Sequence, residues 1–139
     1  MKRSVVIIEN SADDCKLFES MLTGVSDADY SVTSTSNGDE GLAAIESTRP
    51  DCVMLDFGLP GQGSAATWNR IRARYPAMPI VMMTGEDVDF DALESMRAEG
   101  QEYIRKSVAA PETLHQAVSS AVLAVLAVLA FLAIIGREV

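Results

Sequence analysis

The stretch Asp51-Cys-Val-Met-Leu-Asp56-Phe-Gly58 decides the fold of this 139-residue chain. Four apolar residues run without interruption from Cys52 to Leu55, and an acidic residue follows directly. A short apolar run of this kind is typical of a strand buried on both faces, in the middle of a parallel sheet that helices cover on each side. The stretch therefore predicts a central strand that carries Asp56 at its carboxyl end.

Similar apolar runs occur on both sides of this stretch and alternate with helical patterns. The predicted strands are Val5 to Ile8, Tyr30 to Thr35, Cys52 to Leu55, Ile80 to Met83 and Tyr103 to Ile104. The predicted helices, which have apolar residues three or four apart, are Asp13 to Leu22, Asp39 to Ser47, Ser64 to Tyr75, Asp89 to Ala98 and Glu112 onward. Right-handed crossovers between parallel strands then give a doubly wound α/β fold with five strands.

The composition argues against several classes of protein. A chain of 139 residues suits one domain, and its 11 basic against 20 acidic residues give a net charge of -9. Such a charge repels a phosphate backbone, so direct nucleic-acid binding is not expected. Two cysteines and one histidine cannot form a common structural zinc site. No secretory signal precedes the first strand, which makes the cytoplasm the predicted compartment.

Polar residues follow four of the predicted strands. Glu9 and Asn10 follow the first strand, Asp56 the third, Thr84 the fourth and Lys106 the last. Because open parallel sheets bind ligands beyond the carboxyl ends of their strands, we expect these side chains to converge. Two carboxylates repel each other unless a cation lies between them, and oxygen donors suit Mg²⁺. Asp56 is then placed to attack a phosphoryl group whose oxygens Lys106 and Thr84 receive.

In type, order and spacing these residues resemble the receiver domain of two-component response regulators. The resemblance covers roughly residues 3 to 122 and rests on the segments Val5 to Asp14, Asp51 to Gly63, Met82 to Gly85 and Glu99 to Lys106. It implies a flavodoxin-like sheet with the strand order 2-1-3-4-5. It also implies a function in phosphorelay signal transduction, as a phosphoacceptor rather than an enzyme, with a histidine kinase or a phosphotransfer protein as the partner.

The resemblance assigns a role to each residue at the strand ends. It implies that Asp56 is the phosphoacceptor and that Thr84 and Lys106 contact the phosphoryl group. It also implies that Tyr103 is the aromatic switch residue, which turns inward on activation. A domain with these parts signals through protein–protein contacts.

The resemblance also implies a magnesium site. Its ligands are Asn10, Asp56 and the backbone carbonyl of Gly58, with Glu9 acting through a water molecule. The family usually has an aspartate where this chain has Asn10. One direct ligand therefore lacks its negative charge, and we expect a lower affinity for Mg²⁺.

A second departure follows the lysine. The family usually has a proline in a cis peptide at this point, whereas this chain has Ser107, for which a cis bond costs ~3 kcal/mol. A trans peptide here predicts that Lys106 is displaced. The two departures keep an alternative function open, a degenerate receiver that acts as a binding or dimerisation module without phosphorylation.

The end of the chain is unusually apolar. From Ala117 to Ile135, only Ser119 and Ser120 interrupt a run of uncharged apolar residues. A helix that is apolar on every side must be buried in protein or in lipid. We therefore expect a receiver domain over residues 1–122, followed by an apolar extension of its last helix over residues 123–139.

The helix carries a pattern of apolar residues in alternating steps of four and three. These residues are Leu114, Val118, Ala121, Val125, Val128, Leu132 and Ile135. The pattern indicates a homo-oligomer. The apolar residues between them favour a bundle larger than a two-stranded coil, or packing against the receiver core. A membrane span is the alternative, because nineteen helical residues reach about 28 Å. The sparse basic flanks favour protein over lipid.

Overall fold

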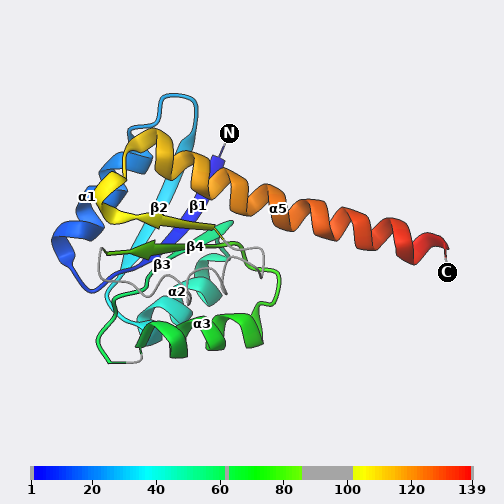
Figure 1. Ribbon diagram of the computed structural model, residues 1–139, viewed down its shortest axis with the longest axis horizontal. Helices are drawn as coiled ribbons and strands as arrows, with labels where there is room; N and C mark the ends of the chain where they lie inside the picture. The colour runs from blue at the N-terminus through cyan, green and yellow to red at the C-terminus, as the bar shows by residue number, and fades with distance from the viewer. Residues whose placement is uncertain (1, 62, 86–101, 139) are drawn as a thin grey trace.

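The computed structural model describes residues 2–61, 63–85 and 102–138 (Figure 1). Its strands are β1 (Lys2–Ile8), β2 (Asp29–Thr35), β3 (Cys52–Asp56), β4 (Ile80–Thr84) and β5 (Glu102–Arg105). All pairings are parallel, and the order β2-β1-β3-β4-β5 confirms the predicted flavodoxin-like sheet. The described helices are α1 (Ala12–Thr23), α2 (Gly38–Thr48), α3 (Gly63–Arg74) and α5 (Pro111–Glu138), and a short 3₁₀ helix, η1 (Lys106–Val108), follows β5. The predicted helix from Asp89 to Ala98 lies outside the described residues.

The sheet is buried on both faces because its strands present apolar side chains to each. In β1, Val5 and Ile7 belong to one core cluster and Val6 and Ile8 to the other. Helices α1 and α5 cover the first cluster, and α2 and α3 cover the second (Figure 1). Strands β3 and β4 are buried along their whole length. This double burial explains why their sequences are continuous apolar runs rather than alternating ones.

The first strand begins earlier than its apolar run. The prediction started it at Val5, whereas β1 begins at Lys2 and pairs with β2 from its first residue. Backbone hydrogen bonds to Asp29 and the residues after it hold this polar beginning in the sheet. Hydrophobic pattern alone does not detect such a segment, because the ladder uses main-chain atoms.

Local interactions fix the start of α1 and the close packing of α2 on the sheet. The hydroxyl of Ser11 caps α1 by accepting a hydrogen bond from the backbone N–H of Asp14. In α2, Gly41 lies directly against Ile8, where any added Cβ would collide with the isoleucine side chain. The close approach of α2 to β1 therefore depends on this glycine.

Helix α5 has two unlike halves. Leu114, Val118 and Ala121 are buried in the core cluster beneath α1 and α5, whereas most large apolar side chains beyond Val122 are exposed. Figure 1 shows this second half projecting away from the body of the domain. The prediction that these first three positions belong to an intermolecular seam is therefore wrong, because the chain's own sheet covers them. The alternative that the whole helix packs on the receiver core is also wrong, since that packing ends near residue 122.

Candidate functional site

Two buried carboxylates lie side by side at the carboxyl edge of the sheet. Asp56 ends β3, and Glu9 follows β1, the strand that pairs with β3. Glu9 is 1% exposed and Asp56 is 2% exposed. Both acids are in place because parallel neighbouring strands end at the same edge. A buried charge of this kind requires a compensating partner.

Lys106 supplies that partner from the end of β5. Its Nζ lies 2.6 Å from Glu9 Oε2, 3.2 Å from Asp56 Oδ1 and 3.5 Å from Asp14 Oδ2. The prediction that Ser107 would leave the lysine displaced is therefore wrong. The flexible lysine stem lets the ammonium reach the acids from η1, in which Lys106 is the first residue.

Sequence reasoning did not assign Asp14 to the site. Its carboxylate joins the cluster from the first turn of α1 and is 39% exposed. The available signal was the acidic pair Asp13-Asp14, which lies in the first turn of the helix that follows the first strand. Three carboxylates thus face one ammonium group.

Burial and charge shift the pKa values inside the cluster in opposing ways. Burial raises the pKa of Glu9 above its usual value, and the negative charge of Asp56 adds to this effect while the Lys106 ammonium reduces it. Burial by itself lowers the pKa of Lys106, but its contacts with Glu9 and Asp56 outweigh burial and raise that pKa. The lysine is consequently held in its charged form.

The loop after β3 is pinned around Asp56. The backbone N–H of Gly58 donates a hydrogen bond of 2.9 Å to Asp56 Oδ1. The Ser64 hydroxyl donates to the Asp56 carbonyl over 2.8 Å and accepts from the Leu59 N–H over 2.9 Å. These bonds fix both the carboxylate and the chain that leaves it, so the acid is oriented before any ligand arrives.

The remaining predicted strand-end residues occupy different environments. Thr84 is 1% exposed and ends β4, the strand between those that carry Asp56 and Lys106. Its hydroxyl lies 3.4 Å from the carbonyl oxygen of Ile104. Asn10, by contrast, is exposed at the beginning of the loop after β1. The structure therefore brings Thr84 into the edge between the charged residues and leaves Asn10 at the rim.

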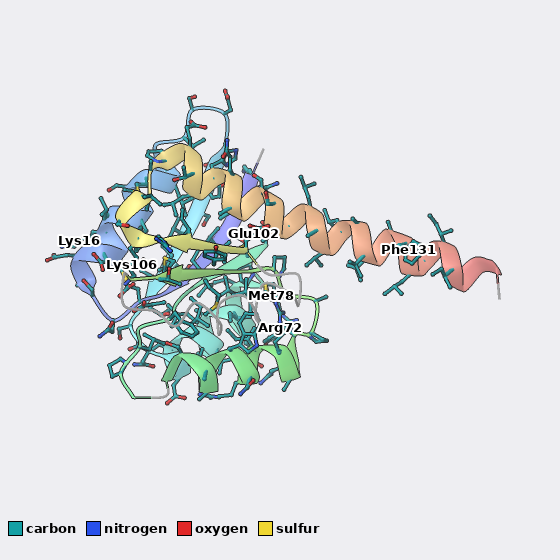
Figure 2. The ribbon with its side chains drawn as sticks, in the orientation of Figure 1. Lys16, Arg72, Met78, Glu102, Lys106 and Phe131 are labelled. Carbon is teal, nitrogen blue, oxygen red and sulfur yellow. The ribbon has the colours of Figure 1, made fainter. Side chains whose placement is uncertain are left out.

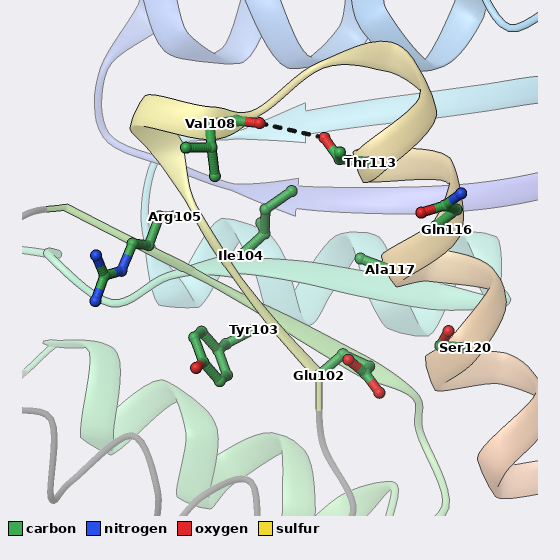
Figure 3. A pocket seen from close by; sticks show the side chains of 9 residues that line it. All are labelled: Glu102, Tyr103, Ile104, Arg105, Val108, Thr113, Gln116, Ala117 and Ser120. Carbon is green, nitrogen blue, oxygen red and sulfur yellow. Dashed lines mark hydrogen bonds between the residues drawn. The ribbon is translucent and has the colours of Figure 1, made fainter.

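The predicted switch residue lies on β5. Tyr103 is half-buried and packs against the core cluster beneath α2 and α3, whereas Ile104 belongs to the opposite cluster. Figure 3 shows the Tyr103 ring on the side of the sheet where α3 lies. A cavity of about 530 Å³ lies between β5 and α5, and the Thr113 hydroxyl donates to the Val108 carbonyl at its edge.

The oxygen donors at this edge fit a magnesium ion that keeps most of its water. Within the described residues, no three His, Cys, Asp or Glu side chains are arranged to hold a metal by themselves. Mg²⁺ commonly binds through one or two carboxylates plus water and phosphate oxygens. Asp56 and Glu9 supply the carboxylates, and Asn10 and Gly58 lie in the adjoining loops.

Comparison with known proteins agrees with this fold. Residues 5–119 match the family described as the response regulator receiver domain. The transcriptional regulatory protein BaeR of Escherichia coli is 31% identical over 79% of this chain and 44% of its own length. The regulator NtrC of Salmonella typhimurium is 32% identical over 72% of this chain and 21% of its own length. The chain thus spans less than half the length of these relatives.

A solved structure supports the fold over nearly the whole chain. NtrX from Brucella abortus superposes with a TM-score of 0.78 at 22% identity, covering 90% of this chain and 28% of that one. The chain belongs to the response regulator receiver domain family of two-component systems.

Members of this family share several general properties. Receiver domains are generally phosphoacceptors rather than enzymes, and they interact with histidine kinases or phosphotransfer proteins. They generally bind Mg²⁺ at the acidic phosphorylation site, and response regulator homologues are typically cytoplasmic.

Proposed function

We propose that this chain accepts a phosphoryl group on Asp56 from a histidine kinase or a phosphotransfer protein and passes the signal on through protein contacts in the cytoplasm. One observation supports this most strongly. The Lys106 ammonium forms ion pairs with the buried carboxylates of Glu9 and Asp56, which come from three different strand ends. A structural ion pair needs one acid, whereas phosphoryl transfer to a carboxylate needs a nucleophile, a second acid and a cation in one place.

The transfer itself follows from the chemistry of these groups. An oxygen of Asp56 attacks the phosphorus atom in line, and the bond from phosphorus to the donor's histidine nitrogen breaks. The electron pair of that bond remains on the departing imidazole. Lys106 and the Thr84 hydroxyl receive the phosphoryl oxygens, and this stabilises the negative charge of the transition state. Lys106 must then exchange one of its carboxylate contacts for the phosphoryl group.

We propose that Mg²⁺ is held by Asn10, Asp56 and the carbonyl of Gly58, with Glu9 acting through water. When bound, it offsets the negative charge of the acids and of the incoming phosphoryl group. Because Asn10 contributes a neutral amide where an acid would contribute a charge, the affinity of the site for the ion is expected to be low. Phosphorylation should therefore need a higher Mg²⁺ concentration than in a receiver with an acid there.

Intact-mass measurement after incubation with Mg²⁺ and acetyl phosphate tests this function. The unmodified chain should gain one phosphoryl group, and the Asp56→Asn variant should gain none. Removal of Mg²⁺ with a chelator should abolish the gain. Phosphorylation of the Asp56→Asn variant at an equal rate would show that another residue is the acceptor.

The exposed amide of Asn10 favours the second candidate function, a receiver that binds its partners without phosphorylation. The Asn10→Asp variant distinguishes the two. If only this variant gains phosphoryl mass at millimolar Mg²⁺, the natural chain is a phosphorylation-independent binding module. If both gain it, the natural chain is a phosphoacceptor.

A further inference from the structure

The second half of α5 exposes more apolar surface than any other described part of the chain. Eight large apolar side chains after Val122 are between 43% and 61% exposed. They are Leu123, Leu126, Val128, Leu129, Phe131, Leu132, Ile134 and Ile135. Figure 2 shows their segment extending well beyond the sheet, with Phe131 near its end. We refer to residues 122–136 as the free segment.

The free segment has no polar side. Its sequence repeats Ala-Val-Leu from Ala121 to Leu129 and continues with an alanine followed by two large apolar residues up to Ile135. A step of three residues rotates by about 300° around a helix, so each residue type winds around the axis instead of staying on one face. No orientation therefore hides the apolar residues from water, and the segment needs a cover on more than one side.

A lipid bilayer is a poor cover for this segment while the domain is folded. The helix from Pro111 to Gly136 is long and apolar enough to cross a membrane by composition. However, Leu114, Val118 and Ala121 within it are buried in the receiver core. The 15 residues that remain reach about 22 Å, which is less than the ~30 Å of the hydrocarbon layer. A complete crossing would require those three side chains to leave the core.

A groove lies at the base of the free segment. Its volume is about 540 Å³, and it separates α5 from the loops that precede β3 and β4. The lining is mostly apolar and includes Tyr75, Met78, Pro79, Val122, Val125 and Leu126. Three of these residues belong to the free segment itself. An occupant of the groove would therefore cover the free segment and part of the receiver body together.

The exposed area matches what a stable association between two chains requires. Eight side chains that are about half exposed present on the order of 100 Å² each, or roughly 800 Å² per chain. One side of a standard protein–protein interface also buries about 800 Å². The free segment alone is thus large enough to form the interface.

We propose that the occupant is the free segment of a second copy of this chain, packed antiparallel. Leu129 is the midpoint of the free segment, so a two-fold axis near it brings the end of each segment to the base of the other. Residues near Ile134 then enter the partner's groove beside Met78. A two-fold interface closes on itself and does not form fibres.

The charge of the protein favours the antiparallel arrangement over the parallel one. Each chain carries a net charge of -9, and a parallel pair would place two acidic receiver bodies side by side. An antiparallel pair places them at opposite ends of the paired helices, where solvent ions screen the repulsion. Because the free segment is apolar all round, two such pairs can associate further, and the assembly contains an even number of chains.

Light scattering after size-exclusion chromatography in detergent-free buffer tests the association. We expect a dimer or a tetramer of the full chain. Leu129→Glu places two carboxylates near the axis and should raise the dissociation constant on the order of 100-fold. Leu17→Glu is the matched control, because Leu17 is 49% exposed and Leu129 is 48% exposed. A monomer, a trimer, or an equal effect of the two substitutions would overturn the proposal.

Disulfide cross-linking tests the direction of packing. In the Met78→Cys/Ile134→Cys double variant, oxidation with diamide should give a covalent dimer. Lys16→Cys/Ile134→Cys should give none, because Lys16 is exposed on α1, far from the groove. Ile134→Cys alone should also give none, and a covalent dimer of that variant would indicate parallel packing.

A vesicle flotation experiment tests the lipid alternative. Flotation of the chain with phosphatidylcholine–phosphatidylglycerol vesicles, without oligomers in buffer, would show that lipid, and not a second chain, covers the free segment. Failure here leaves the chemistry of Asp56 untouched.

Discussion

Charged side chains are usually exposed and apolar ones buried, and the two ends of the molecule reverse this in opposite ways. At the carboxyl edge of the sheet, charged groups are buried: Glu9 and Asp56 lie almost entirely out of solvent beside Lys106. At the far end of α5, apolar side chains such as Phe131 are in solvent. Figure 2 shows Lys106 and Phe131 near opposite ends of the long axis.

The difference between the ends lies in how each departure is compensated. The buried acids are paired within the chain, because the ammonium group offsets much of their charge and the pinned loop holds Asp56 in place. The exposed apolar side chains have no such compensation in a single chain. The charged end therefore suits a reversible reaction within the domain, and the apolar end suits a lasting association between chains.

Removal of the Lys106 ammonium group should have the largest effect of these substitutions, on the rate of phosphorylation. Lys106→Ala should slow phosphorylation by acetyl phosphate on the order of 10²–10³-fold, about 3–4 kcal/mol in activation free energy, because the transition state loses its fixed positive charge. Circular dichroism should show that the variant remains folded. Lys16→Ala, which changes an exposed lysine on α1, is the control and should leave the rate unchanged. Equal rates for the two variants would mean that Lys106 has only a structural role.

Loss of a buried leucine on α5 should lower stability far more than loss of a half-exposed leucine on α1. Leu114 is fully buried, so Leu114→Ala should lower the free energy of unfolding by about 3 kcal/mol through lost burial and a cavity. Leu17→Ala removes a half-exposed leucine from α1 and should change it by less than about 1 kcal/mol. Urea titration at one protein concentration measures both. Equal losses would contradict the assignment of residue 114 to the receiver core.

Introducing an acid at position 10 should raise the affinity of the site for Mg²⁺ moderately. Asn10→Asp adds a charged oxygen ligand, and we expect about tenfold tighter Mg²⁺ binding, or ~1.4 kcal/mol. Magnesium titration followed by intrinsic fluorescence measures the affinity, with Trp68 as the single tryptophan. Asn69→Asp on α3 is the control for added charge alone. Weaker binding by Asn10→Asp would place the ion elsewhere.

Charge pairs outside the cluster should contribute least. Arg70 and Asp39 form an ion pair of 2.7 Å between α3 and α2, but their side chains are 53% and 86% exposed. Because solvent screens such a pair, Arg70→Ala should change the free energy of unfolding by less than about 0.5 kcal/mol and leave phosphorylation unchanged. A larger loss in thermal or urea unfolding would show that burial is not what distinguishes the Lys106 cluster.

Parts of the site could be predicted and parts could not. Strand-end positions follow from apolar runs, so the sequence correctly predicts that Asp56 lies at the end of β3 and that Lys106 follows β5. The contact of Asp14 with Lys106 could not be predicted in this way, because it depends on the angle at which α1 leaves the sheet. The effect of Ser107 was wrongly predicted, since a local rule about one peptide says little about how far a lysine side chain can reach.

The amino-acid order alone determined the alternation of strands and helices, the residues at the strand ends and the extreme apolarity of α5. These properties depend on neighbours in the chain and on periodicity, which the sequence contains directly. Only the tertiary structure decided that Lys106 pairs with both Glu9 and Asp56, and that α5 divides near residue 122 into a buried and an exposed half. Both outcomes depend on where segments distant in sequence end relative to one another, because burial and charge pairing are set by the packing of the whole sheet and its helices.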